Sequence, residues 1–270
     1  AAILLKMGGY GFLRFLLPIF PDASLAFLPY IAALSIIGVI YGALVAFAQS
    51  DLKKLVAYSS VSHMGLVILG IFALNIQGMH GAVYQMLGHG LSTGALFIVV
   101  GMLYERRHTK LIREFGGVSR VMPIFATFFL VATLSSIGLP LLNGFVGEFL
   151  ILLGVFLSNR IWGVLGATGL ILGAVYMLWA YGRVMFGPLD RDENKALVDL
   201  SLREIFVLLP IAVMMVAMGL YPKPFLERIE PSAKELLKIT YERAQEPAVT
   251  LHALEPSLSR PQPLLPQPEP

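Results

Sequence analysis

The hydrophobic residues of this chain occur in runs of about 20 separated by short polar segments, the pattern of membrane-spanning helices. Seven runs are visible, at approximately residues 1–20, 25–49, 52–74, 79–104, 121–156, 162–186 and 204–221. The fifth run is too long for one straight span and contains Gly138-Leu139-Pro140 and Gly144. Because proline disrupts a helix interior, we expect this run to break near its middle. The pattern therefore predicts an all-α, polytopic transmembrane bundle of about seven spans, one of them broken in mid-membrane.

The pattern changes after Tyr221, which divides the chain into three predicted regions: 1–221, 222–246 and 247–270. In the second region, Pro231 to Gln245 is predicted to form an amphipathic helix that lies on the membrane surface or docks on a partner. The third region contains seven prolines and little periodicity, which is typical of a disordered tail.

Composition supports a lipid environment. Hydrophobic residues make up 57% of the chain and charged residues only 14%, with a mean hydropathy of +0.76, whereas soluble domains carry about 25% charged residues. The chain has no cysteine, which excludes disulfides, cysteine-ligated iron–sulfur clusters and thiol catalysis on it. No basic patch suggests nucleic acid binding. The chain opens inside an apolar run at Ala1 without Met, and we interpret Ala1 as a truncation point rather than a processed end.

The basic residues predict the orientation. Positive charge favours cytoplasmic loops, and the connections opposite to the basic set carry only Arg160. We therefore expect the basic loops on the cytoplasmic (or matrix) side, and the segment after Tyr221 on the outer face. The basic set consists of Lys53, Lys54, Arg106, Arg107, Lys110, Arg113, Arg120, Arg183, Arg191, Lys195 and Arg203.

Four ionisable residues on four predicted spans fall near the middle of the hydrocarbon layer: Lys6, His63, His89 and Glu148. A charge at this depth costs at least about 2.5–3.5 kcal/mol and persists where it faces a protein interior or a watery path. Each residue alone has an ordinary explanation: a packed histidine, a lysine that snorkels, or a glutamate that caps a half-helix. Together they predict a row of proton-exchanging groups in the membrane plane.

Other polar residues are candidates for supporting this row. Arg14 lies closer to the outer end and could snorkel, and His80 is interpreted as an interface residue. Ser62 and Tyr58, with Ser59, Ser60, Gln85, Ser92 and Thr93, would either hold water between titrating groups or pack helices together. Gly138, Pro140 and Gly144 would open the broken helix beside Glu148, as half-helices do in transporter ion sites. No pattern predicts a nucleotide or metal site.

Four stretches resemble the antiporter-like subunits of respiratory complex I, a family of proton-translocating membrane proteins. They are DLKKLVAYSSVSHMG (51–65), GAVYQMLGHGLSTGALF (81–97), YERRHTK (104–110) and GLPLLNGFVGEF (138–149). The resemblance extends from Ala1 to about Tyr221, and the combination of motifs is specific. The proline-rich tail is not part of it.

The resemblance implies a fourteen-helix fold in which helices 4–8 and 9–13 are inverted repeats. This chain would begin within helix 8 and run to helix 14, with helix 12 broken. Lys6 matches the helix-8 lysine that connects two half-channels, and His63 and His89 match the histidines of the central polar axis. Glu148 matches the helix-12 residue of the output half-channel, a glutamate in the chain M branch and typically a lysine in the sister chains L and N.

The resemblance implies proton translocation driven by quinone reduction elsewhere in NADH–quinone oxidoreductase. Lys6 would pass protons through water, His63 and His89 to Glu148. FMN, iron–sulfur clusters and quinone are expected on partner subunits and no cofactor on this chain. The expected partners are other membrane-arm subunits, especially neighbouring antiporter-like chains, in a bacterial inner membrane.

Two departures from the family pattern bear on this expectation. Leu141 and Leu142 replace the small residues often found after Gly-Leu-Pro, and the input half-channel glutamate and lysine have no counterpart. Two other functions remain open: a subunit of a multisubunit cation/proton antiporter, and a structural membrane anchor that does not pump.

Overall fold

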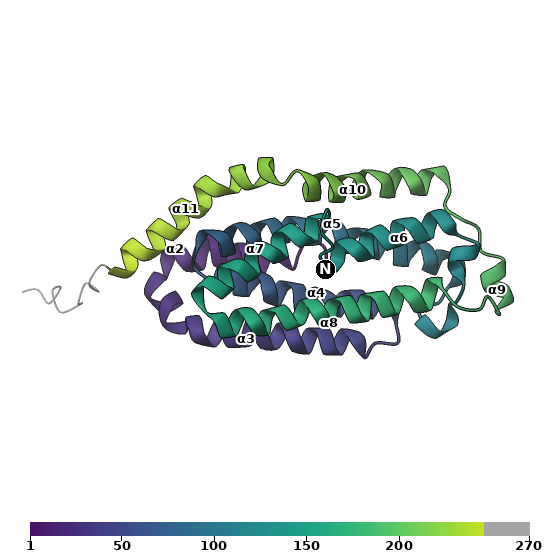
Figure 1. Ribbon diagram of the computed structural model, residues 1–270, viewed down its shortest axis with the longest axis horizontal. Coiled ribbons are helices and arrows are strands. Elements are labelled where there is room, and N and C mark those ends of the chain that lie inside the picture. Colours follow the sequence, from purple (N-terminus) through teal and green to yellow (C-terminus); the bar gives the residue numbers. More distant parts are fainter. Residues whose placement is uncertain (246–270) are drawn as a thin grey trace, which may run out of the picture.

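The computed structural model describes residues 1–245, and long helices aligned with the longest axis dominate it (Figure 1). Five helices are long and apolar enough to cross a membrane: α3 (Pro21–Phe47), α4 (Leu52–Ile71), α5 (Ile76–Arg107), α8 (Arg160–Met185) and α10 (Leu202–Leu220). Two shorter apolar helices are α6 (Pro123–Ser136) and α7 (Asn143–Ser158). Residues 1–245 contain no strand, and an isolated antiparallel bridge joins Asp51 to Leu111. The predicted all-α membrane bundle is confirmed.

Polar caps set several of the helix boundaries. Asp51 accepts a hydrogen bond from the amide of Lys54 (3.0 Å) at the start of α4, and Asn75 accepts one from Gly78 (2.8 Å) at the start of α5. Asn159 does the same for α8. These side chains satisfy backbone donors that have no partner within the helix. Polar residues between the apolar runs therefore fix where these helices start.

The first apolar run is helical over a shorter range than the predicted 1–20. Helix begins at Lys6 and continues through α1 (Lys6–Gly11), the π-helical segment η1 (Phe12–Leu16) and α2 (Leu17–Ile19). π-Helical turns often occur at functional sites. Residues 1–5 lie outside the helix, although the amide of Lys6 bonds to the carbonyl of Ile3 at 3.0 Å.

The fifth run breaks as predicted, between the end of α6 at Ser136 and the start of α7 at Asn143. Two residues in the break adopt positive φ angles, Gly138 at 70° and Leu141 at 78°. The first angle suits glycine, whereas a side chain at the second is strained. α10 packs along the break, because a Cβ at Gly219 would collide with the backbone of Leu141.

Helix α11 (Lys223–Gln245) begins beside the middle of the bundle, where α10 ends, and runs obliquely along it towards the end opposite α9 (Figure 1). The predicted start at Pro231 is wrong, because the helix runs through Pro231 and begins eight residues earlier. It docks on this chain: the hydroxyl of Tyr241 donates to the carbonyl of Leu74 (2.8 Å), and Arg243 donates to the carbonyl of Pro18 (2.6 Å). The predicted disordered tail, residues 247–270, lies outside the described residues, and the division into three regions stays a prediction.

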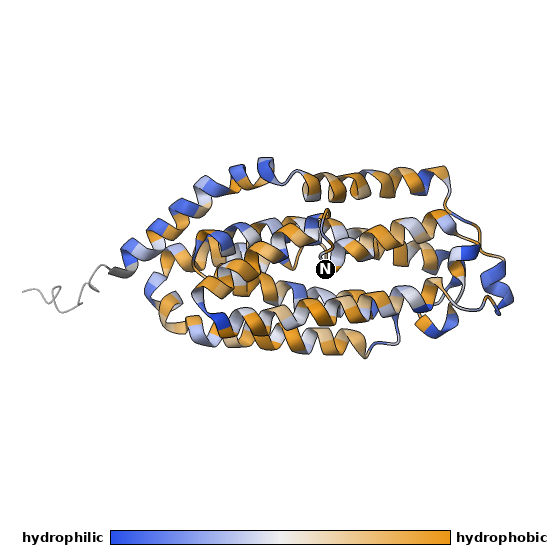
Figure 2. Ribbon diagram, in the orientation of Figure 1, coloured by the Kyte–Doolittle hydropathy of each residue, from blue (hydrophilic) through white to orange (hydrophobic). Residues whose placement is uncertain are grey.

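The basic connections gather at the opposite end, around α9 (Asp192–Lys195) and the short turns η2 (Ile112–Glu114) and η3 (Val118–Arg120). There Arg106 forms two hydrogen bonds with the carboxylate of Glu204 (2.7 and 2.8 Å), linking α5 to α10. Figure 2 shows hydrophobic residues along the long helices and hydrophilic residues at this end and on α11. Hydrophilic residues therefore concentrate at the end around α9 and on α11, and hydrophobic residues predominate along the long helices between them.

Candidate functional site

A polar layer separates two hydrophobic cores along the bundle. The core near the basic end includes Leu55 and Val56 of α4, and the other core begins at Met64 of the same helix. Buried polar side chains from several helices lie between them, in a region where a continuous apolar core would otherwise be expected. The buried members on α4, α5, α6 and α7 are Ser59, Ser60, Ser62, His63, Gln85, His89, Ser92, Thr93, Thr133, Ser135, Ser136, Asn143 and Glu148.

Within this layer the four predicted ionisable residues form one series. The Nζ atom of Lys6 lies 2.6 Å from Nδ1 of His89. The rings of His89 and His63 have centroids 5.2 Å apart, and Nδ1 of His63 lies 3.2 Å from Oε1 of Glu148. Lys6 is half-buried, whereas His63, His89 and Glu148 are buried. The structure thus brings together residues that are up to 142 positions apart in the sequence.

Neighbouring side chains contact Glu148 and His89 of the series. Gln85 donates from Nε2 to Oε1 of Glu148 (3.1 Å). The hydroxyl of Thr93 lies 3.1 Å from Nε2 of His89. Nε2 of His63 and Oε2 of Glu148 are buried without a hydrogen-bond partner among the described protein atoms. In each histidine, Nδ1 therefore lies beside Lys6 or Glu148, whereas Nε2 lies near Thr93 in His89 and has no partner among the described residues in His63. This arrangement suits proton transfer across the ring.

The helix break provides space for Glu148. A Cβ atom at Gly138 would overlap Oε2 of the glutamate, and the positive φ of Gly138 disfavours any other residue. A Cβ at Gly147 would collide with the side chain of Gln85. These glycines let the carboxylate and its amide partner approach the backbone of the broken helix.

Asn143 is a buried polar residue that sequence reasoning missed. Its Nδ2 donates to the carbonyl of Gly88 on α5 (3.0 Å), and its Oδ1 accepts from the hydroxyl of Ser135 on α6 (2.5 Å). The start of α7 is thereby tied to both neighbouring helices. The sequence could have indicated this residue, because Asn143 is the polar residue directly after Gly-Leu-Pro-Leu-Leu.

Tyr176 of α8 was also missed. Its side chain is fully buried, and its hydroxyl has no hydrogen-bond partner among the described residues. This hydroxyl lies beside Ser59 and within electrostatic range of Glu148. Sequence pattern gave no signal for it, because a tyrosine within an apolar run normally packs in a core.

The structure separates several predicted supporting residues from the series. Tyr58 is 41% exposed, and Pro140 is exposed at the break rather than beside Glu148. Ser62 donates to the carbonyl of Val39 (2.7 Å), a contact between α4 and α3. Gly144 packs against the backbone of Ser135. Ser62 and Gly144 make contacts between helices, and none of the four residues forms a hydrogen bond with Lys6, His63, His89 or Glu148 in the described part of the chain.

Arg14 and His80 lie near α11. Arg14 is exposed and lines a cleft that also includes Arg228. His80 has a buried Nε2 and faces Glu230 and Lys234 of α11. Outside the membrane region, the ammonium of Lys234 lies 2.5 Å from Glu230 and holds the pKa of that carboxyl below its ordinary value. No group of three or more His, Asp or Glu within residues 1–245 has the geometry of a metal site.

A buried layer of titratable side chains beside a broken membrane helix places the chain among polytopic membrane proteins with a polar interior, an arrangement typical of transporters. Residues 1–173 match the family described as NADH:quinone oxidoreductase/Mrp antiporter, TM. The chain belongs to this family, which confirms the resemblance found in its sequence motifs.

Known relatives refine this assignment. The chain is 51% identical over 237 residues to NADH-quinone oxidoreductase subunit M of Rickettsia prowazekii (strain Madrid E). The aligned region covers 88% of this chain and 48% of that protein. In the solved structure of respiratory complex I from Thermus thermophilus with bound NADH, a similar chain has a TM-score of 0.82 and 33% identity, over 87% of this chain and 50% of that one.

The Mrp complex from Dietzia sp. DQ12-45-1b also contains a similar chain, with a TM-score of 0.78 and 20% identity over 88% of this chain and 53% of that one. This likeness concerns the fold alone. The chain spans about half the length of the curated relatives it matches. The family is therefore shown by sequence and fold together.

Proposed function

We propose that this chain is part of a proton-translocating membrane-arm subunit of NADH–quinone oxidoreductase and carries its central axis and output half-channel. The series of contacts from Lys6 through His89 and His63 to Glu148 is the observation that carries this proposal. Its partners would be the other membrane-arm subunits, with FMN, iron–sulfur clusters and quinone on partner chains. This chain would carry no redox chemistry.

In the proposed mechanism each histidine takes up a proton on one ring nitrogen and releases another from the opposite nitrogen. Protonated Lys6 donates to Nδ1 of His89, which releases the proton on Nε2 towards Thr93 and water. His63 accepts a proton on Nε2 and gives one from Nδ1 to Oε1 of Glu148. One positive charge thus leaves Lys6, and one negative charge on Glu148 is neutralised.

Release would follow from the surroundings of Glu148. Oε2 faces the glycine of the helix break, and Oε1 accepts from Gln85 when the carboxylate is charged. Hydrogen bonding favours the charged form, whereas burial favours the neutral form. A change in the charge of a neighbour therefore shifts the balance and expels the proton. In the proposed orientation the basic loops are cytoplasmic and release occurs towards the α11 end.

The test is Glu148→Gln in the full-length chain within the assembled enzyme. Glutamine retains the shape and hydrogen bonding of the side chain but cannot accept the proton. We expect NADH-driven proton pumping in membrane vesicles to fall by about tenfold or more, because the substitution removes an essential acid–base group. Glu105→Gln, at an exposed position on α5, is the matched control and should pump normally.

Normal proton yield per NADH in Glu148→Gln would refute the role of this residue. Sodium-dependent transport without NADH oxidation would instead favour a cation/proton antiporter. Normal pumping after neutralisation of all four residues would leave a structural anchor as the remaining function.

A further inference from the structure

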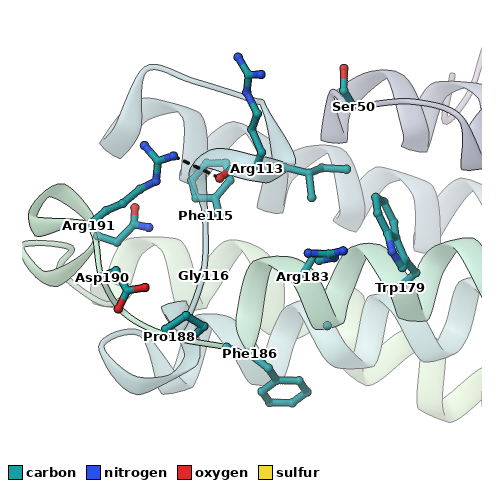
Figure 3. A pocket seen from close by; sticks show the side chains of 14 residues that line it. Ser50, Arg113, Phe115, Gly116, Trp179, Arg183, Phe186, Pro188, Asp190 and Arg191 are labelled. Atoms are coloured by element: carbon teal, nitrogen blue, oxygen red, sulfur yellow. Dashed lines mark hydrogen bonds between the residues drawn. The ribbon is translucent and has the colours of Figure 1, made fainter.

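A cavity of about 620 Å³ lies at the basic end, between the loop after α5 and the segment that joins α8 to α9. Figure 3 shows Arg113, Arg183 and Arg191 around it, with Trp179 and Phe186 on the α8 side. The cavity belongs to neither the polar layer nor the proposed proton path. Three guanidinium groups and the aromatic rings of Phe115, Trp179 and Phe186 line a site that no part of the proposed function uses.

The charges of the cavity favour an anion. Arg183 lies over the ring of Trp179 at 5.7 Å and forms no ion pair among the described residues. Arg191 pairs with Glu114, which also lies 3.5 Å from Arg113. Arg191 further donates to the backbone carbonyl of Arg113 (3.5 Å; dashed in Figure 3). Among the described residues, Asp190 is the one acidic residue that lines the cavity, against three arginines, so an excess of positive charge remains.

The cavity lies where a membrane would end. α8 stops at Met185, and Phe186 directly after it is 59% exposed. Exposed apolar side chains follow from this point towards the membrane centre on the paired helices α3 and α8. They are Leu44 (51%), Phe47 (46%), Val175 (51%) and Leu178 (46%). Aromatic residues and arginines at this level are typical of the boundary between headgroups and acyl chains.

We propose that this cavity binds the phosphate-bearing headgroup of an anionic phospholipid, with the acyl chains along the exposed faces of α3 and α8. Guanidinium groups bind phosphate oxygens through paired, charge-assisted hydrogen bonds, and basic pockets at the cytoplasmic ends of membrane helices recognise such lipids. A water-soluble phosphate compound would use the arginines but not the apolar faces below them. The continuity of these two surfaces selects the lipid.

The test uses the full-length protein in nanodiscs of phosphatidylcholine that contain a phosphatidylglycerol with a photoreactive diazirine near its headgroup. After illumination, mass spectrometry should map the adduct to residues 112–116 and 182–191. Arg183→Gln should lower this labelling about fivefold, the factor that corresponds to about 1 kcal/mol per arginine. Arg120→Gln, an exposed arginine at the same end and outside the cavity, should leave it unchanged.

Two further measurements separate a bound lipid from a soluble phosphate and from a folding defect. Asp190→Asn removes the opposing carboxylate and should raise the labelling, so the proposal stays testable even if Arg183→Gln fails to fold. Glycerol 3-phosphate in excess should not compete, whereas unlabelled phosphatidylglycerol should. The proposal is overturned by equal labelling with a phosphatidylcholine probe, by adducts elsewhere on the chain, by labelling insensitive to both substitutions, or by competition from the soluble phosphate.

Discussion

Gly138 combines two constraints at a single residue: a left-handed backbone angle of 70° and contact with the carboxylate of Glu148. Alanine at this position would be strained by about 1–2 kcal/mol in the backbone alone. Its methyl group would also displace Oε2 of Glu148. We expect Gly138→Ala to lower the thermal unfolding midpoint in detergent and to impair pumping.

Gly101→Ala is the control for this substitution. Gly101 lies within α5, and a Cβ there would meet no atom within 4 Å. Alanine should therefore leave the midpoint unchanged or raise it, since alanine is favoured over glycine in a helix by about 1 kcal/mol. Equal effects of the two substitutions would contradict the special role of the break.

Tyr176 and Tyr181 offer a second comparison at the scale of one hydroxyl group. The hydroxyl of Tyr176 has no partner among the described protein atoms and lies near Glu148, whereas that of Tyr181 donates to the carbonyl of Ala126 (3.2 Å). We expect Tyr176→Phe to slow proton pumping without loss of stability. Tyr181→Phe should destabilise the protein by about 1 kcal/mol and leave pumping intact. Pumping assays and thermal unfolding would reveal the opposite pattern if the assignment is wrong.

Helical phase explains which site residues the sequence could predict. Ser59 and His63 are four residues apart and share a face of α4, whereas Tyr58 is five residues from His63 and points elsewhere. The depth of the four titratable residues followed from the helical rise, because each lies within a recognisable apolar run. The contact of Tyr176 with the site depends on how α8 packs against its neighbours, which periodicity within one helix does not contain.

Among the elements, a bidentate ion pair links α5 to the start of α10. Arg106 binds both carboxylate oxygens of Glu204, which also caps α10 through Ser201. A double-mutant cycle with Arg106→Gln and Glu204→Gln should give a coupling energy of about 1–2 kcal/mol, because the pair is bidentate and only about one-fifth exposed. Thermal unfolding of the wild type, the two single variants and the double variant measures this coupling energy.

The exposed pair Lys195 and Asp192 is the control cycle and should show no measurable coupling, because water and salt screen two charges on an open surface. Similar coupling in both pairs would show that the link between α5 and α10 has no special strength.

At the scale of elements, the apolar runs predicted the long helices, and Gly-Leu-Pro predicted the break. The start of α11 was predicted incorrectly, because Pro231 resembles a first-turn proline, yet the helix continues through it. The docking of α11 on this chain depends on distant carbonyls at Leu74 and Pro18, which no local pattern specifies.

At the scale of the whole molecule, the two ends of the bundle must face opposite sides of the membrane. The basic loops and α9 lie at one end, and α11 runs from the middle of the bundle towards the other (Figures 1 and 2). Since the chain has no cysteine, single cysteines report their location without further changes. Asp192 of α9 and Glu227 of α11 are both exposed acidic residues, with 92% and 60% of the side chain accessible.

We expect a membrane-impermeant maleimide to label Glu227→Cys in intact cells, and to label Asp192→Cys only after the membrane is opened. The physical reason is the excess of Lys and Arg in the loops around α9, which retains them on the cytoplasmic side. Labelling in inverted vesicles should show the reverse pattern and serves as the control. If Asp192→Cys alone reacts in intact cells, the molecule is inverted, and Glu148 would have to release its proton towards the basic end.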